Sequence, residues 1–154
     1  MRTVAFTGSR NLTKEQELKI YRYFKICGVP DGNWLVGDCP TGVDFFMRRA
    51  ANYYQKNLEV IHRTGDERYQ FAERSKLMVK ILRSYPNPIL YGFVKDLCPP
   101  EIFPGSGTWN GNGTWGTISF AKKCGLPISL HWIGDSHQKN WFPNWMLETQ
   151  LSLF

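Results

Sequence analysis

The stretch TVAFTGSR, residues 3–10, decides how the chain begins to fold. Its first residues are apolar or β-branched, which is typical of a buried strand, and Gly8 then opens a turn. Thr13 and Gln16 follow with the spacing of a capping box, in which both side chains satisfy free N–H groups at a helix start. The segment therefore predicts a strand, a glycine turn and a helix, which Gly28 closes.

The same order of elements recurs along the chain. The clearest helical stripe starts at Val43 and repeats apolar residues every three or four positions as far as Tyr54. Strands are predicted at 3–7, 33–36, 58–61, 87–91 and 127–130, with the later helices at about 68–84 and 118–124. Alternating strands and helices predict an α/β protein, a Rossmann-like three-layer α/β/α sandwich with a mostly parallel sheet.

Length and composition fit one globular domain outside the membrane. The chain has 154 residues and no apolar run near the roughly 20 residues that cross a bilayer. Its first residues reach a turn too soon for a signal peptide, so we expect a cytoplasmic protein without a membrane partner. The four cysteines form no C-x-x-C pair and the three histidines show no ligand spacing, so we expect no metal site and no cofactor.

The net charge of +6 lies in the first half of the chain. Residues 1–83 contain 15 Lys and Arg against 9 Asp and Glu, whereas the remainder is balanced at 4 against 4. This distribution fits an anionic partner, either a nucleotide or a nucleic acid, although solvated helix faces are the simpler explanation from charge alone.

The chain is expected to divide at residue 131. Residues 1–131 would form the Rossmann-like domain, and 132–154 an aromatic-rich extension. Two roles stay open for the extension: packing on the same domain, or a surface for a partner, including a second copy in a homo-oligomer. Its aromatic residues are Trp132, Trp141, Phe142, Trp145 and Phe154.

Three glycine-bearing turns are expected at one edge of the sheet. Parallel sheets bind ligands beyond the carboxyl ends of their strands, where loops lead into helices. Free backbone N–H groups in such turns, aided by a helix dipole, suit a phosphate group. The candidate ligand-binding residues in these turns are Gly8, Ser9, Arg10, Gly37, Asp38, Thr41, Gly42, Gly111, Gly113 and Thr114.

Charged side chains near these turns strengthen the prediction of an anion site. Arg10 can hold a phosphate with two parallel hydrogen bonds. Arg74 and Lys76 either reach the same edge or lie on a solvated helix face. Asp44, in the first turn of the second helix, either complements the helix dipole or accepts hydrogen bonds from a ribose.

Several short motifs resemble those of the SLOG superfamily in their order. The segments are VAFTGSR at 4–10, G-x4-G-V-D at 37–44, RSKLM at 74–78, GNGT at 111–114 and A-x3-G-L-P at 121–127. The resemblance is greatest to small single-domain YspA/YpsA-like members, which are related to the DprA core and to the "lonely guy" phosphoribohydrolases. It implies a Rossmann-like fold that binds nucleotides or nucleotide-derived molecules.

Binding of such a nucleotide-like molecule, in a sensor role, is the leading functional hypothesis, with three alternatives. The first is a phosphoribohydrolase-type N-glycosidase using Arg74 and Asp44, because the acidic residue that follows the G-x-G-T turn in that family is missing here. The second, ranked lower, is single-stranded nucleic-acid binding with Trp34, Trp109 and Trp115 as stacking platforms. The third, a dinucleotide fingerprint at 111–116, lacks the strand that must precede it.

The run GSGTWNGNGTWG, residues 105–116, contains two similar copies within the long loop predicted at 92–110 and beyond it. The second copy adjoins a helix and is expected to hold the ligand. The first has no helix behind it and is expected to form a flap, in which Trp109 either closes over a base or packs against the domain.

Overall fold

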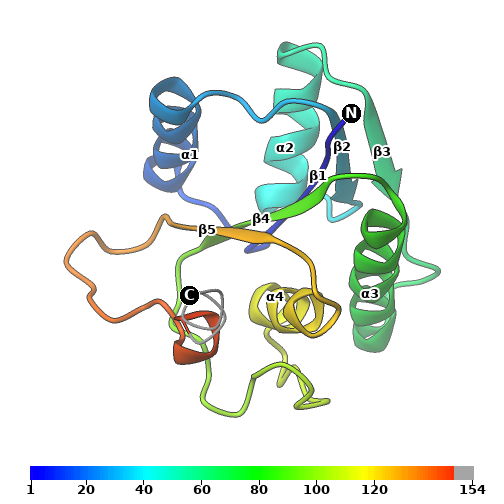
Figure 1. Ribbon diagram of the computed structural model, residues 1–154. Helices are drawn as coiled ribbons and strands as arrows, with labels where there is room; N and C mark the ends of the chain where they lie inside the picture. The colour runs from blue at the N-terminus through cyan, green and yellow to red at the C-terminus, as the bar shows by residue number, and fades with distance from the viewer. Residues whose placement is uncertain (148–154) are drawn as a thin grey trace.

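A computed structural model describes residues 1–147 and contains one five-stranded parallel sheet (Figure 1). The strands lie in the order β3-β2-β1-β4-β5 and every neighbouring pair is parallel. Their bounds are β1 Thr3–Gly8, β2 Asn33–Gly37, β3 Leu58–Ile61, β4 Pro88–Val94 and β5 Ile128–Trp132. The helices are α1 Lys14–Cys27, α2 Gly42–Tyr53, α3 Arg68–Ser84 and α4 Gly113–Lys123.

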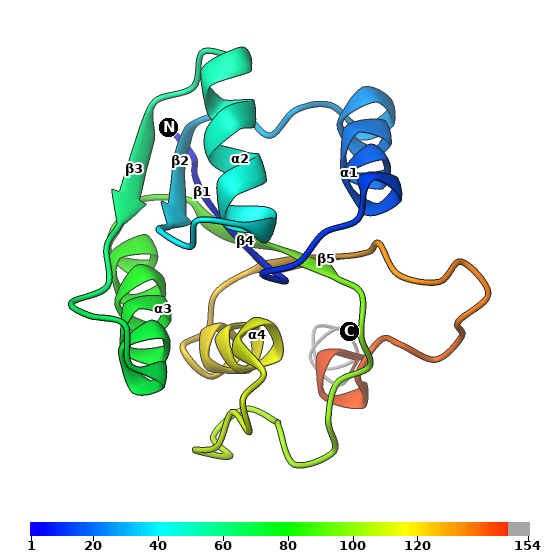
Figure 2. The same ribbon diagram turned by 180° about the vertical axis from the view of Figure 1, so that it is seen from behind.

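The helices form a layer on each face of the sheet, which confirms the predicted three-layer α/β/α architecture. Helices α1 and α2 cover one face, and α3 and α4 cover the other (Figures 1 and 2). The central strand β1 alternates accordingly: Val4 and Phe6 belong to the core under α1 and α2, and Ala5 belongs to the core under α3 and α4. None of the helices in residues 1–147 has both the length and the apolar character needed to cross a membrane.

The order of the strands creates a switch point between β1 and β4. The chain adds β2 and β3 on one side of β1 and then returns to add β4 and β5 on the other side. Connections from β1 and β4 therefore leave toward opposite faces, and a crevice opens between the carboxyl ends of these two strands.

Two boundaries differ from the sequence-based prediction. Helix α4 begins at Gly113 instead of residue 118, because the Asn112 side chain caps it by accepting a 2.9 Å hydrogen bond from the Trp115 amide. Strand β4 continues to Val94 instead of residue 91, since it pairs with β1 as far as Gly8 and Phe93. The loop between β4 and α4 is therefore shorter than predicted. The helix begins within GNGT, the second of the two similar copies in residues 105–116.

The described part of the C-terminal extension packs on the same domain. The rings of Trp132 and Trp141 stack with centroids 5.3 Å apart, and Trp145 meets Trp115 edge-on at 6.2 Å. Both Trp141 and Trp145 contact the core beneath α3 and α4. Of the two roles considered for the extension, this favours packing for residues 133–147; Phe154 lies outside the described residues.

We expect His131 to make the protein less stable in acid. Its ring lies 3.9 Å from that of Tyr23, and burial lowers the pKa of His131 from 6.5 to about 4. Between pH 4 and pH 6.5 the unfolded chain therefore binds more protons than the folded chain. The free energy of unfolding is consequently highest above pH 6.5 and decreases as the pH falls toward 4.

In thermal melts from pH 4 to 7.5, the melting temperature of His131→Phe should fall less at acid pH than that of the wild type. The matched control is His137→Phe, because His137 is exposed. If the melting temperature of His131→Phe falls as steeply with decreasing pH as that of the wild type, His131 is not the source of this pH dependence.

Candidate functional site

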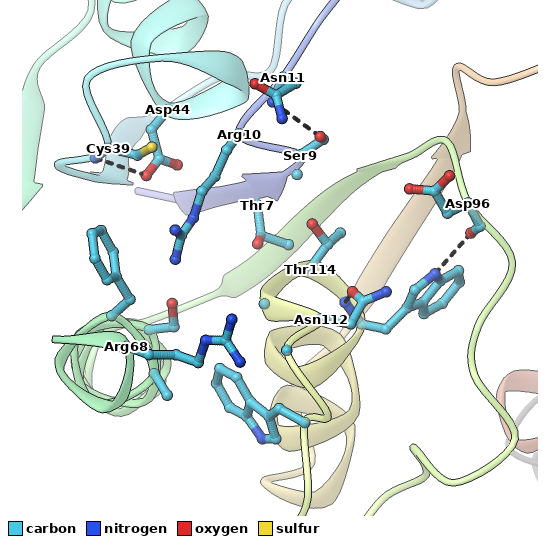
Figure 3. Close-up of a pocket in the computed structure, with 18 of the residues that line it drawn as sticks. Thr7, Ser9, Arg10, Asn11, Cys39, Asp44, Arg68, Asp96, Asn112 and Thr114 are labelled. Carbon is cyan, nitrogen blue, oxygen red and sulfur yellow. Dashed lines mark hydrogen bonds between the residues drawn. The ribbon is translucent and has the colours of Figure 1, made fainter.

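A cavity of about 850 Å³ lies at the switch point (Figure 3). Its volume is in the range of small-molecule sites, about 300–1,000 Å³. The walls come from the loop after β1, the start of α3, the end of β4 and the start of α4. Of the predicted site residues, Gly8, Ser9, Arg10, Thr41, Asp44, Arg74, Gly111, Gly113 and Thr114 line it.

Two arginines project into this cavity, one from the loop after β1 and one from the start of α3. Arg10 follows β1, and Arg68 is the first residue of α3; both are exposed, and Figure 3 shows both guanidinium groups directed toward the cavity centre. Within residues 1–147 neither guanidinium group forms an ion pair with a carboxylate. Both positive charges are therefore free to meet an anionic ligand.

An aromatic ring positions one of these arginines. The Arg10 guanidinium carbon lies 4.0 Å from the centroid of the Phe71 ring, and Arg63 lies 4.6 Å from the same centroid. The Arg10 backbone is also held, because its carbonyl oxygen accepts a 2.7 Å hydrogen bond from the Thr41 hydroxyl. Cation–π contact and backbone anchoring together restrict Arg10 before any ligand arrives.

The amino end of α4 supplies backbone donors. Asn112 satisfies the Trp115 amide, and the N–H groups of Gly113 and Thr114 have no acceptor in the described part of the chain. The helix dipole places partial positive charge at this end, which favours an anion. The second GNGT copy therefore has the donors that the sequence predicted for it.

A buried ion cluster lies beneath the cavity. Arg74 Nη1 lies 3.0 Å from Asp38 Oδ1 and 3.0 Å from Asp44 Oδ2. Gly37 makes room for the cluster, since a Cβ there would lie 2.3 Å from Arg74 Nη1. The sequence predicted that Arg74 would contact the ligand, but its Nη1 atom donates to these two carboxylates and its Nη2 atom donates to the Ser75 hydroxyl.

The two carboxylates of the cluster respond differently to burial. Burial raises the pKa of Asp44, against the opposing effects of Arg74 and the Cys39 amide. Burial also acts to raise the pKa of Asp38, but hydrogen bonds from Arg63 and Arg74 outweigh it and the pKa is lowered. Asp38 is therefore the firmly ionised partner of Arg74, whereas Asp44 is the carboxylate whose charge depends on Arg74 remaining in place.

The second glycine turn supports the loop after β1. The Val43 amide donates to the Ser9 carbonyl at 2.9 Å, and the Cys39 amide donates to Asp44 at 3.2 Å. Gly42 has φ +73°, and a Cβ there would lie 2.1 Å from the Ser9 oxygen, so only glycine fits. The amides of Cys39 and Val43 therefore have acceptors within the protein and are not free to bind an anion.

Lys76 does not reach the cavity, contrary to the prediction. Its Nζ atom lies 5.6 Å from the centroid of the Trp109 ring and 5.9 Å from that of Phe120. Gly37, Asp38 and Gly42 also do not line the cavity. Their positions agree with the supporting roles described above.

The tryptophans proposed as stacking platforms occupy different environments. Trp34 and Trp115 are buried at 0 % and 1 % exposure, so neither presents a face to a nucleic-acid base. Trp109 lines the cavity and packs against Gly116, where a Cβ would lie 2.2 Å from the indole. The first copy, GSGTW at residues 105–109, thus places its tryptophan against α4.

Sequence reasoning missed many of the residues that line the cavity, among them Arg68, Phe71, Asn112 and Asp96. Asn112 could have been found, since asparagine before a helix is a common cap. Arg68 could have been found from its place at the start of a helix that follows a parallel strand. No sequence signal marks Asp96 or the contact between Phe71 and Arg10.

The chain was compared with family models, with curated proteins and with solved structures, and none of the three comparisons gave a match.

Proposed function

We propose that this protein binds a nucleotide or nucleotide-derived molecule through its phosphate groups, in the cavity between β1 and β4. The observation that carries the proposal is the convergence of Arg10, Arg68 and the free amides of Gly113 and Thr114 on one cavity. Guanidinium groups and helix amino ends are both well suited to bind phosphate. The resemblance to the SLOG superfamily supports the same ligand class.

A nucleotide also needs space for its sugar and its base, and the cavity provides that space. Its volume of about 850 Å³ has room for a sugar and a base beside the phosphates. Trp109 adds aromatic surface to the walls, whereas the ring of Phe71 is already in contact with Arg10 and Arg63. Base–aromatic stacking contributes about 1–3 kcal/mol where a ring face is available.

We further propose that the site binds its ligand without hydrolysing an N-glycosidic bond. Asp44 Oδ2 is engaged by Arg74 and by the Cys39 amide, and Arg74 is shared with Asp38. After the GNGT turn, the Thr117 hydroxyl donates to the Gly113 carbonyl at 2.6 Å instead of providing a carboxylate. Incubation with nucleoside monophosphates should therefore release no free base.

Arg10→Ala and Arg68→Ala should each weaken binding of a nucleoside diphosphate about 10-fold or more, because each removes a charged partner of the phosphates. Isothermal titration calorimetry against nucleotides, ADP-ribose and dinucleotides measures this. Arg83→Ala is the matched control, since Arg83 is an exposed arginine of α3 outside the cavity. Absence of binding to the wild type at millimolar concentration of every ligand would overturn the proposed function.

A further inference from the structure

We propose that Asp96 is the residue that recognises the ribose of the bound nucleotide, and that it makes the site select ribonucleotides over 2′-deoxyribonucleotides. The inference rests on the proposed function and deepens it, because it assigns the sugar-binding end of the same cavity. Asp96 follows β4, on the opposite side of the switch point from Arg10.

The backbone of Asp96 is anchored, but its carboxylate is free. Its carbonyl oxygen accepts a 2.8 Å hydrogen bond from Trp115 Nε1, and Trp115 is only 1 % exposed. The Asp96 side chain is exposed to the cavity and has neither a hydrogen bond nor an ion pair within residues 1–147. A carboxylate that has no partner of its own and stands on an anchored backbone can accept hydrogen bonds from a ligand.

The position of Asp96 separates it from the phosphate end. Figure 3 shows its carboxylate across the cavity from the guanidinium groups of Arg10 and Arg68, with the start of α4 between them. Phosphates near Asp96 would be repelled, whereas a neutral group that donates hydrogen bonds would be attracted. The two adjacent hydroxyl groups of ribose match two carboxylate oxygens, as acidic residues at strand ends do in dinucleotide-binding folds.

The other charged groups of the cavity do not compete for this role. Asp44 is tied to Arg74 and to the Cys39 amide, and Glu67 caps α3 beside Arg68. Lys95 also lines the cavity, and it forms no ion pair with Asp96 in the part of the chain that the structure describes. Asp96 is thus the carboxylate that lies away from the arginines and is free to accept.

The test compares ADP, 2′-deoxy-ADP and pyrophosphate as ligands of the wild type and of Asp96→Ala, by titration calorimetry in EDTA. The wild type should bind ADP about 10-fold more tightly than 2′-deoxy-ADP, which corresponds to one hydrogen bond to a charged group. Asp96→Ala should bind the two nucleotides equally and should bind pyrophosphate as tightly as the wild type or more tightly. Asp31→Ala, an exposed aspartate before β2, should behave as the wild type.

The outcomes distinguish this inference from the proposed function. If the wild type binds none of the three ligands, the proposed function fails. If the wild type binds nucleotides but Asp96→Ala keeps the preference for ADP, or the wild type shows no preference, the ribose assignment is wrong. An effect of Asp96→Ala that is found only with added Mg²⁺, and is equal for both nucleotides, would also overturn it, because Asp96 would then act through a metal ion.

Discussion

Gly113→Val is expected to abolish nucleotide binding while leaving the fold intact. Gly113 is the first residue of α4 and lines the cavity, and a Cβ there meets nothing within 4 Å. The valine side chain would therefore project into open space and cover the free amides of Gly113 and Thr114. Each hydrogen bond from these amides to a charged phosphate contributes about 1.5–3 kcal/mol, so losing both weakens binding by more than about 100-fold.

Gly107→Val, in the first copy of the motif, is the matched control. Gly107 has φ +75° and lies outside the cavity, so valine there is strained and should destabilise the fold by about 1–2 kcal/mol. The folded variant should bind the nucleotide only slightly more weakly than the wild type. Equal losses of affinity in the two variants, measured by calorimetry below their melting temperatures, would mean that the second copy has no special part in binding.

Arg74→Met is expected to reduce the free energy of unfolding by about 3–5 kcal/mol, because it leaves the buried carboxylate of Asp44 without its cation. Asp44 is 8 % exposed, and Arg74 is the only cation that its carboxylate contacts as an ion pair within residues 1–147. Urea denaturation measures the loss. Arg83→Met on the same helix should change stability by less than about 0.5 kcal/mol, as is usual for exposed positions.

Combining Arg74→Met with Asp44→Asn should recover part of the lost stability. The second change removes the buried charge that the first leaves uncompensated, so the two effects are not additive. A loss below about 1 kcal/mol for Arg74→Met alone would show that the cluster contributes little to the fold. Arg74 would then again be a candidate for direct contact with the ligand.

Most of the fold was predictable because its signals are local. The apolar run at 3–7 and the Thr13–Gln16 capping box each identify one element from adjacent residues, and both occur as expected. The start of α4 was missed because Gly111 and Gly113 lower helix propensity, whereas the Asn112 cap and the contacts of Trp115 decide the outcome.

The candidate site was predictable only in part, because it depends on distances between segments far apart in the sequence. The edge of the sheet and the second GNGT copy follow from the strand–turn–helix order. By contrast, Asp38 meets Arg74 from 36 residues away, and no local pattern announces that pairing. Lys76 is two residues beyond Arg74, which turns it about 200° around α3 and away from the cavity.

Assigned ¹H–¹⁵N NMR spectra of the wild type during titration with ADP test the central proposal most directly. The account predicts that the largest chemical-shift changes fall on the amides of Gly113 and Thr114, with further changes at Arg10 and Asp96. No change at millimolar ADP would contradict it. So would changes confined to residues away from the cavity, such as those between α1 and β5.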